Sequence, residues 1–243
     1  MTHNPRFSET VVHVDSVRVD REPSQTELSW ASFNDFLLNG EIDRFTKLLA
    51  RYELFQRVVN LPGDIVEGGV FKGTGVLYWA RLIQVFNPLS ARRVVGFDTF
   101  HGYPRSTSRD HDKETGEHFL TESKYTEGSP DEIYKRASSL GLSQRVELIQ
   151  GDSTKTIREY ARANPGFRIA ILNLDFDIYE PTAIALEEFY PLVVPGGVII
   201  LDEYASRGWG ESEAADAFFK DKHVTYKSIP WALSPTAFVC KVA

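Results

Sequence analysis

Short apolar runs alternate with amphipathic stretches along most of the chain. The apolar runs predict buried strands at 64–70, 92–98, 145–152, 167–177 and 198–204. The amphipathic stretches predict helices at 76–86, 130–142, 153–164, 180–193 and 211–221. Two more apolar runs, 223–229 and 236–242, are joined by a short link with prolines and without a helix. Parallel strands need long crossovers, so the chain is predicted to form a Rossmann-like α/β fold: a mostly parallel, seven-stranded sheet with an antiparallel C-terminal strand and helices on both faces.

The N-terminal quarter has a different pattern. Residues 1–29 are polar and mixed in charge, and fit either an edge strand or a mobile arm. From about residue 29 to 60 the apolar residues have helical spacing and form two stripes. The second stripe consists of Phe45, Leu48, Leu49, Tyr52 and Phe55, and Leu54 falls outside it. These helices either form a dimer interface or cover the sheet. We therefore divide the chain into an N-terminal arm with helices (1–60) and a Rossmann-like domain (61–243).

A long polar segment interrupts the strand–helix pattern at about 101–128. It contains Gly, Pro and three histidines and has few periodic apolar residues. A connection of this length inside a domain is usually functional, so we predict an irregular lid inserted into the domain. Tyr103 in this segment and Trp209 and Tyr179 elsewhere are candidates to line an acceptor pocket, with Tyr179 the more typical of a core residue.

Composition and charge exclude several classes of protein. The net charge is −7, which argues against general binding to nucleic acid or an anionic membrane. The apolar runs are too short to span a bilayer, and the first residues lack the apolar segment of a secretory signal. The single cysteine, Cys240, excludes an internal disulfide and a Cys metal cluster. A cytoplasmic location is the expectation.

The ends of the first three strands carry residues suited to a nucleoside cofactor. Ligands bind beyond the carboxyl ends of the strands in an open parallel sheet. The candidate cofactor-binding residues at these ends are Glu67, Gly68, Gly69, Gly73, Asp98, Thr99, Asp152 and Ser153, with Asp175 from the fourth strand. A carboxylate at Asp98 can accept both hydroxyls of a ribose. Alternatively, the glycines only turn a strand into a helix, and Asp152 or Ser153 only caps the helix that follows.

Two cofactors compete for this site. The segment from Gly68 to Gly75 does not have the G-x-G-x-x-G spacing of a dinucleotide site. Glu67 would oppose a pyrophosphate but suits a cofactor with an amino group and a sulfonium. S-adenosylmethionine is therefore favoured over NAD.

Four acids lie at the ends of the fourth and fifth predicted strands. Asp175 and Asp177 alternate at the end of one, and Asp202 and Glu203 end the other. These carboxylates would converge and repel one another unless they were protonated, hydrogen-bonded or bound to a cation. Oxygen ligands without His or Cys suit Mg²⁺, with Ca²⁺ or Mn²⁺ as alternatives. Otherwise one or two of these acids cap helices or pair with Arg.

Four motifs together resemble a known family. VEGGVFKGTG, GFDTFHGYP, LDFDIYEPT and VIILDEY occur in the order typical of the macrocin O-methyltransferase (TylF-like) family, and the similarity runs from about Phe45 to the C-terminus. The resemblance implies a class I methyltransferase that uses S-adenosylmethionine and Mg²⁺ to methylate a sugar hydroxyl. It implies metal ligands at Asp175, Asp202 and Glu203 and a general base at Asp177.

Two residues depart from the family pattern. Glu203 stands where the family typically has a second aspartate, and Phe176 where it has a glycine. The predicted function is thus a divalent-metal-dependent O-methyltransferase acting on a sugar or glycosylated natural product, with a small-molecule acceptor as its partner. An NAD-dependent oxidoreductase and a non-catalytic methyltransferase-like subunit stay open as alternatives.

Overall fold

The computed structural model describes residues 25–104, 107–122 and 128–242. The chain divides into two units at Gly40. The described part of the first unit is the helix α1 (Gln25–Asn39), and the second unit contains the remaining elements. Most of the predicted arm or edge strand at 1–29 lies outside the described residues. The predicted division at about residue 60 stays a prediction, but helix α2 (Ile42–Val58) lies within the larger unit.

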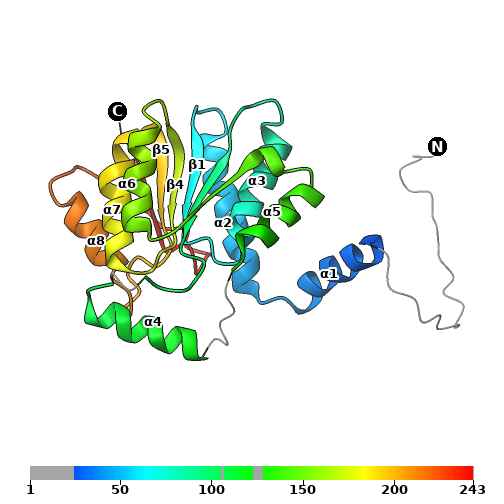
Figure 1. Cartoon of the computed structure of the whole chain (residues 1–243), viewed down its shortest axis with the longest axis horizontal. Helices are drawn as coiled ribbons and strands as arrows, with labels where there is room; N and C mark the ends of the chain where they lie inside the picture. The colour runs from blue at the N-terminus through cyan, green and yellow to red at the C-terminus, as the bar shows by residue number, and fades with distance from the viewer. Residues whose placement is uncertain (1–24, 105–106, 123–127, 243) are drawn as a thin grey trace, which may run out of the picture. The chain divides into compact units, whose positions relative to one another are not determined.

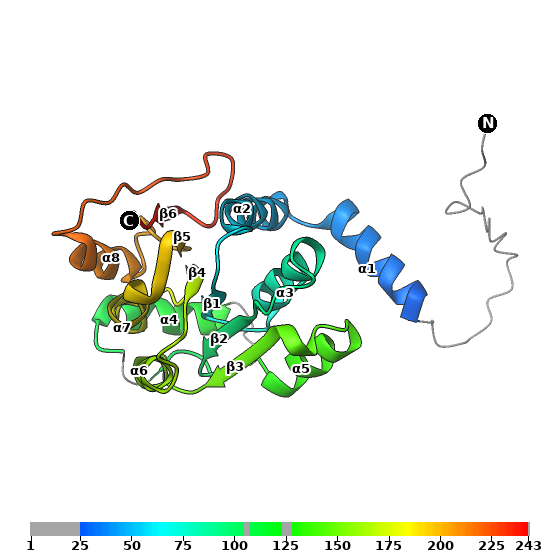
Figure 2. The same cartoon turned by 90° about the horizontal axis from the view of Figure 1, so that it is seen from above.

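The larger unit is built on a six-stranded sheet in the order β3-β2-β1-β4-β5-β6 (Figure 2). The strands are β1 (Asp64–Gly68), β2 (Val94–Asp98), β3 (Val146–Gln150), β4 (Ile169–Leu174), β5 (Val193–Leu201) and β6 (Ala237–Cys240). The first five are parallel and β6 pairs with β5 antiparallel. The predicted Rossmann-like class and the antiparallel last strand are confirmed.

The prediction of a seventh strand at 223–229 is wrong. In this segment Lys227 exchanges one pair of backbone hydrogen bonds with Phe238, of 2.9 and 2.8 Å, and the pairing goes no further. Its apolar side chains do not share one face. Ile229 packs into the core on one side of the sheet, whereas Val224 and Tyr226 pack against the core on the other side. The apolar content that predicted a strand is explained by this packing around the sheet edge.

Helices cover both faces of the sheet. Helices α2, α3 (Thr74–Phe86) and α5 (Pro130–Ser139) lie on one face, and α6 (Ser153–Ala163), α7 (Tyr179–Phe189) and α8 (Glu211–Phe219) on the other (Figures 1 and 2). Two 3₁₀ turns, η2 (Ser143–Arg145) and η3 (Tyr190–Leu192), lead into β3 and β5. All six side chains of β4 are buried, as expected for a central strand covered on both faces.

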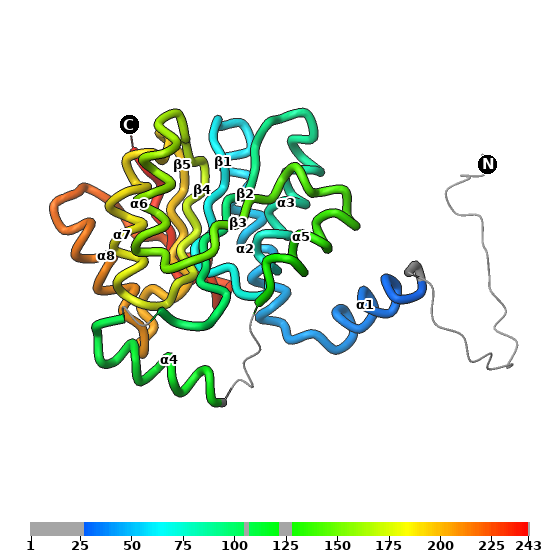
Figure 3. The backbone as a smooth tube through the Cα atoms, in the orientation of Figure 1, coloured from blue at the N-terminus to red at the C-terminus, as the bar shows by residue number. Residues whose placement is uncertain are grey.

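The predicted lid segment contains a helix, α4 (Asp110–Glu122), so its description as irregular is wrong. The helix lies beneath the sheet in Figure 3. Asp112 fixes it there: its buried carboxylate accepts hydrogen bonds from the backbone N–H groups of Tyr179 (2.8 Å) and Gly210 (2.7 Å). Both partners follow the carboxyl ends of central strands, so α4 lies over the edge where ligands of this fold bind.

Helix α2 buries a different face from the predicted stripe. Phe55 of the stripe is buried as predicted, but it is buried together with Val58 and with Leu54, which was predicted to lie outside the stripe. Phe45 and Leu49 from the stripe are exposed. The buried face also carries Arg51, which the hydrophobic pattern did not include.

The assignment of the buried face of α2 can be tested by truncating one buried and one exposed leucine of this helix. Leu54→Ala is expected to lower the free energy of unfolding by about 2–5 kcal/mol, because it leaves a cavity in the core. Leu49→Ala, whose side chain is 41% exposed, is expected to change it by less than about 1 kcal/mol. Urea unfolding measures both. Equal losses, or a larger loss for Leu49→Ala, would contradict the assigned face.

Candidate active site

A pocket of about 420 Å³ opens at the carboxyl ends of the parallel strands. The strand order reverses between β1 and β4, and their last residues diverge there, which makes a crevice. The predicted site residues that line it are Gly69, Asp98, Thr99, Ser153, Asp175, Asp177, Asp202 and Glu203. Residues from five separate strand ends and loops thus meet in one place.

The glycine turn after β1 and the end of β2 form one side of the pocket. Gly69 has a φ of 80°, and a Cβ atom there would lie 1.9 Å from the carbonyl oxygen of Asp175, so only glycine fits. Asp98 accepts hydrogen bonds from the backbone N–H groups of Phe71 (2.8 Å) and Phe100 (2.7 Å). Its carboxylate therefore fixes the two loops that border this side.

Four predicted cofactor residues do not line the pocket: Glu67, Gly68, Gly73 and Asp152. Asp152 caps α6, accepting a hydrogen bond from the N–H of Thr154 at 3.0 Å, so the cap is Asp152 and Ser153 faces the pocket instead. Glu67 is buried, with Oε1 at 3.7 Å from Nη1 of Arg51. Burial raises the pKa of Glu67 to about 7 despite the charge of Arg51. The cofactor roles of these four residues stay predictions.

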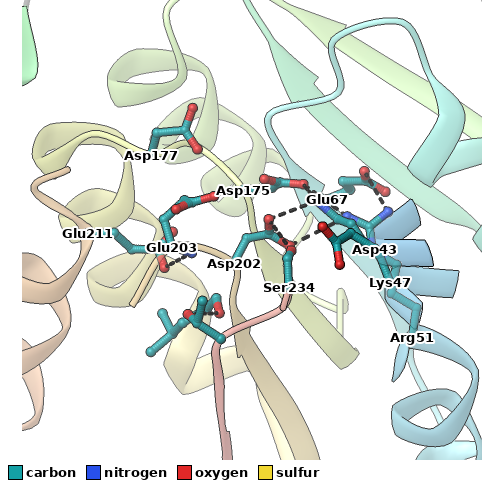
Figure 4. Close-up of polar contacts among 12 residues, drawn as sticks. Asp43, Lys47, Arg51, Glu67, Asp175, Asp177, Asp202, Glu203, Glu211 and Ser234 are labelled. Carbon is teal, nitrogen blue, oxygen red and sulfur yellow. Dashed lines mark hydrogen bonds and ion pairs between the residues drawn. The ribbon is translucent and has the colours of Figure 1, made fainter. Parts of the chain in front are cut away.

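The acidic residues converge, but their partners are two cations from α2 (Figure 4). Lys47 Nζ lies 2.8 Å from Asp202 Oδ2 and 3.3 Å from Asp175 Oδ2. Arg51 Nη2 lies 2.9 Å from the same Asp175 oxygen. Asp202 Oδ2 also accepts a hydrogen bond of 2.7 Å from Ser234. The alternative in which an Arg pairs with the cluster is therefore correct for Asp175, and a lysine joins it.

These cations decide where the negative charge resides. Burial raises the pKa of Asp202, but the charges of Lys47 and Arg51 outweigh it and hold that pKa below its usual value. Burial and the neighbouring Asp202 raise the pKa of Asp175. Burial and Asp202 also raise the pKa of Glu203. The two cations therefore favour the ionised form of Asp202 most strongly.

Asp177 lies apart from these cations. Strand β4 ends at Leu174, and Asp177 has a φ of 68°, so the strand alternation expected for Asp175 and Asp177 does not apply. Oδ2 of Asp177 accepts a 2.6 Å hydrogen bond from the hydroxyl of Tyr103. Burial and the charge of Asp175 raise the pKa of Asp177 well above its usual value, and the Tyr103 bond opposes this shift. A raised pKa makes its carboxylate a stronger base.

Aromatic side chains form much of the remaining wall. The rings of Tyr103 and Trp209 pack at 5.6 Å between centroids, and both line the pocket with Phe71, Phe119 and Phe176. This confirms Tyr103 and Trp209 as pocket residues, whereas Tyr179 packs against Arg109 and does not line it. Flat apolar faces suit an adenine ring and the apolar face of a sugar.

Membership of a family follows from comparison with known proteins. The model of the macrocin O-methyltransferase (TylF) family matches residues 37–231. This is most of the chain and includes every pocket residue named above.

The chain belongs to the macrocin O-methyltransferase (TylF) family.

Curated relatives of this TylF-family chain match part of its length. A mycinamicin III 3''-O-methyltransferase of Micromonospora griseorubida is 29% identical over 148 residues, which cover 60% of this chain and 56% of that protein. An 8-demethyl-8-(2,3-dimethoxy-alpha-L-rhamnosyl)-tetracenomycin-C 4'-O-methyltransferase of Streptomyces olivaceus is 32% identical over 150 residues. These residues cover 60% of this chain and 54% of that protein. The matched segment thus spans just over half of these relatives.

Solved structures are similar over more of the chain. The calicheamicin methyltransferase CalS11 has a TM-score of 0.65 and 26% identity, covering 90% of this chain and 94% of its own. The O-methyltransferase NovP has a TM-score of 0.69 over 81% of this chain and 79% of its own, and its 22% identity supports the fold alone. The TylF-family chain therefore has a methyltransferase-type Rossmann-like fold.

Sequence reasoning missed the cations of this TylF-family site. Lys47 and Arg51 continue the spacing of Leu54 and Val58 on one face of α2. Positions separated by four, three and four residues share a helix face. The sequence did contain a signal for this pairing. Two basic residues lie in line with a buried apolar stripe, in a chain that also has four clustered acids.

The side chain of Phe176, at the position where the family typically has a glycine, occupies space beside the glycine turn. Its ring lies over Gly68: a Cβ on Gly68 would come within 2.2 Å of the ring. The ring is nearly buried and lines the pocket. Phe176 therefore narrows the pocket beside the glycine turn and depends on Gly68 for its space.

A double-mutant cycle tests this dependence. Gly68→Ala is expected to lower the free energy of unfolding by about 1–3 kcal/mol, because the methyl group overlaps the ring. In a Phe176→Ala background the same change should cost less than about 0.5 kcal/mol. Gly166→Ala is the control, since a Cβ there meets no atom within 4 Å. Equal costs of Gly68→Ala in both backgrounds, by urea unfolding, would refute the contact.

Proposed function

We propose that this chain is an S-adenosylmethionine-dependent O-methyltransferase that methylates a hydroxyl group of a sugar or glycosylated natural product. The observation that carries the proposal is a single pocket that joins the glycine turn after β1 and Asp98 to the isolated carboxylate of Asp177. The glycine turn and Asp98 provide a place for a nucleoside cofactor, and Asp177 provides a base beside that cofactor. Family membership supports this chemistry.

The cofactor end of the pocket is formed by the glycine turn and Asp98. A Cβ at Gly69 would meet the backbone of Asp175, so glycine keeps this turn open to close approach of a ligand. The segment from Gly68 to Gly75 lacks the G-x-G-x-x-G spacing of a dinucleotide site, and the matching family model is that of a methyltransferase. S-adenosylmethionine is therefore proposed in preference to NAD.

The acceptor class is proposed from the names of relatives and from the pocket wall. The relatives above are named as O-methyltransferases of mycinamicin III and of a rhamnosyl-tetracenomycin, and CalS11 is also described as a TDP-rhamnose 3'-O-methyltransferase. Tyr103 and Trp209 offer flat faces against which a sugar ring can pack. We propose a small hydroxylated acceptor of this kind.

The predicted Mg²⁺ does not fit the residues as they are arranged. Its ligands would be Asp175, Asp202 and Glu203, bound at about 2.1 Å. Lys47 already contacts oxygens of Asp175 and Asp202, and Arg51 and Ser234 take further contacts on these oxygens. Asp202 Oδ1 is buried without a hydrogen bond and lies 3.9 Å from Nη2 of Arg51, so a cation already stands beside this oxygen as well. Among the described residues no three His, Cys, Asp or Glu side chains are arranged to hold a metal ion.

The chain's own groups can perform the proton transfer. Tyr103 donates to one oxygen of Asp177 and orients the carboxylate, leaving Oδ1 to take the proton of the acceptor hydroxyl. The acceptor oxygen then forms a bond to the methyl carbon as the carbon–sulfur bond breaks. The bonding pair remains on sulfur, giving S-adenosylhomocysteine. The remaining contribution is alignment of oxygen, carbon and sulfur in the pocket.

Replacement of the base tests this assignment. Asp177→Asn is expected to lower kcat for methyl transfer by about 10²–10⁴-fold, because an amide cannot take the proton. The assay follows labelled methyl from S-adenosylmethionine into a panel of nucleotide sugars and glycosides. Asp221→Asn, at an exposed position on the surface, is the control and should keep full activity. Full turnover by Asp177→Asn would remove it as the base.

Cofactor binding separates this proposal from its alternatives. Calorimetric binding of S-adenosylhomocysteine without binding of NAD would support a methyltransferase. Binding of NAD alone would favour the oxidoreductase, and binding of neither would favour a non-catalytic subunit. In the described part of the chain no helix has the length and apolar character to cross a bilayer. A homodimer and a cytoplasmic location stay predictions.

A further inference from the structure

Lys47 occupies the position in which the sequence predicts a metal. Its ammonium bridges Asp175 and Asp202, two of the three predicted metal ligands, and it lines the pocket. Lys47 comes from α2, far from the acids in the sequence (Figure 4). The cluster is therefore supplied with a cation by the chain itself.

Helix α2 holds this cation firmly in place. One turn further along, Arg51 is almost fully buried, contacts Asp175 and Glu67, and lies over the ring of Trp79 at 5.7 Å. Leu54 continues the same face into the hydrophobic core. Because a packed helix sets the direction of side chains four residues apart, the packing of α2 aims Lys47 at the carboxylates.

The charge state of Lys47 makes it a donor rather than a base. Its Nζ lies 2.8 Å from Asp202 Oδ2 and 3.3 Å from Asp175 Oδ2, and an amine paired with two carboxylates keeps its proton. The side chain is thus an ammonium at neutral pH, with three N–H groups. Two of them serve Asp202 and Asp175. Among the described residues the third N–H has no hydrogen-bond partner, and Lys47 lines the pocket, so this N–H can donate to a ligand there.

We propose that Lys47 is a built-in cation that takes the place of the divalent metal and donates a hydrogen bond to the acceptor oxygen. The proposal rests on the proposed function. As Asp177 takes the hydroxyl proton, negative charge develops on the acceptor oxygen, and the ammonium beside it stabilises that charge until the bond to the methyl carbon has formed. Lys47 keeps its own proton throughout, so the atoms and charges balance as above.

Arg44 offers a matched comparison. It lies on the same helix and also lines the pocket, but its side chain is 72% exposed and forms an ion pair with Glu41 at 4.0 Å. Removing either residue takes one positive charge from α2. Only loss of Lys47 frees oxygens of Asp175 and Asp202.

Binding of Mn²⁺ measured by electron paramagnetic resonance tests the proposal without an activity assay. The full-length protein is titrated with Mn²⁺ as wild type, Lys47→Met, Arg44→Met and the double variant Lys47→Met with Asp175→Asn. We expect Lys47→Met to bind one Mn²⁺ at least tenfold more tightly than wild type, and the other two not to gain this site. Circular dichroism and S-adenosylhomocysteine binding verify that each variant is folded.

Each outcome has a definite meaning. One tight Mn²⁺ in the wild type, or no gain in Lys47→Met, would overturn the proposal. Once an acceptor is found in the methyl-transfer assay, wild-type activity should be unchanged in EDTA and Lys47→Met should lose at least tenfold in kcat/KM. Loss of wild-type activity in EDTA would also overturn it. Absence of methyl transfer to every acceptor would refute the proposed function, while the Mn²⁺ titration would still decide the role of Lys47.

Discussion

The site depends on the pairing of two cations on α2 with carboxylates at the carboxyl edge of the sheet. Glu67, Asp175 and Asp202 come from β1 and from the ends of β4 and β5, and are brought together by the parallel arrangement. Several buried carboxylates would repel one another and raise the cost of folding. Lys47 and Arg51 supply the opposing charges at 2.8–3.9 Å. The same contacts that make this edge stable also determine what the pocket can bind.

This pairing divides the pocket into two chemical regions. Near α2, the carboxylates are neutralised and held by salt bridges. At the other side, Asp177 receives a hydrogen bond from Tyr103 and, among the described residues, no ion pair with a cation, and burial and Asp175 raise its pKa. A base and a cation on opposite sides of one cavity can together ionise an alcohol that neither could ionise alone. The aromatic wall formed by Tyr103 and Trp209 closes the space between helix α4 and the strand ends.

The sequence was sufficient for elements defined by strong local patterns. The buried runs predicted six real strands and placed the acids at their ends. It was insufficient where packing decides: 223–229 has the composition of a strand but wraps around the sheet edge, and 110–122 forms a helix whose few apolar residues carry little periodicity. The partners of the acids were missed for a related reason. Lys47 and Arg51 belong to a face defined by Leu54 and Val58, and the predicted apolar stripe on α2 shares only Phe55 with the residues that α2 buries.

The central claim is that a lysine, and not a metal ion, stands between Asp175 and Asp202. A crystal structure of the protein grown with S-adenosylhomocysteine and soaked in Mn²⁺, with anomalous data collected at the manganese edge, measures this directly. The account predicts no anomalous peak at these carboxylates and Lys47 Nζ within about 3.5 Å of both. A peak coordinated by Asp175, Asp202 and Glu203, with Lys47 displaced from the cluster, would contradict it.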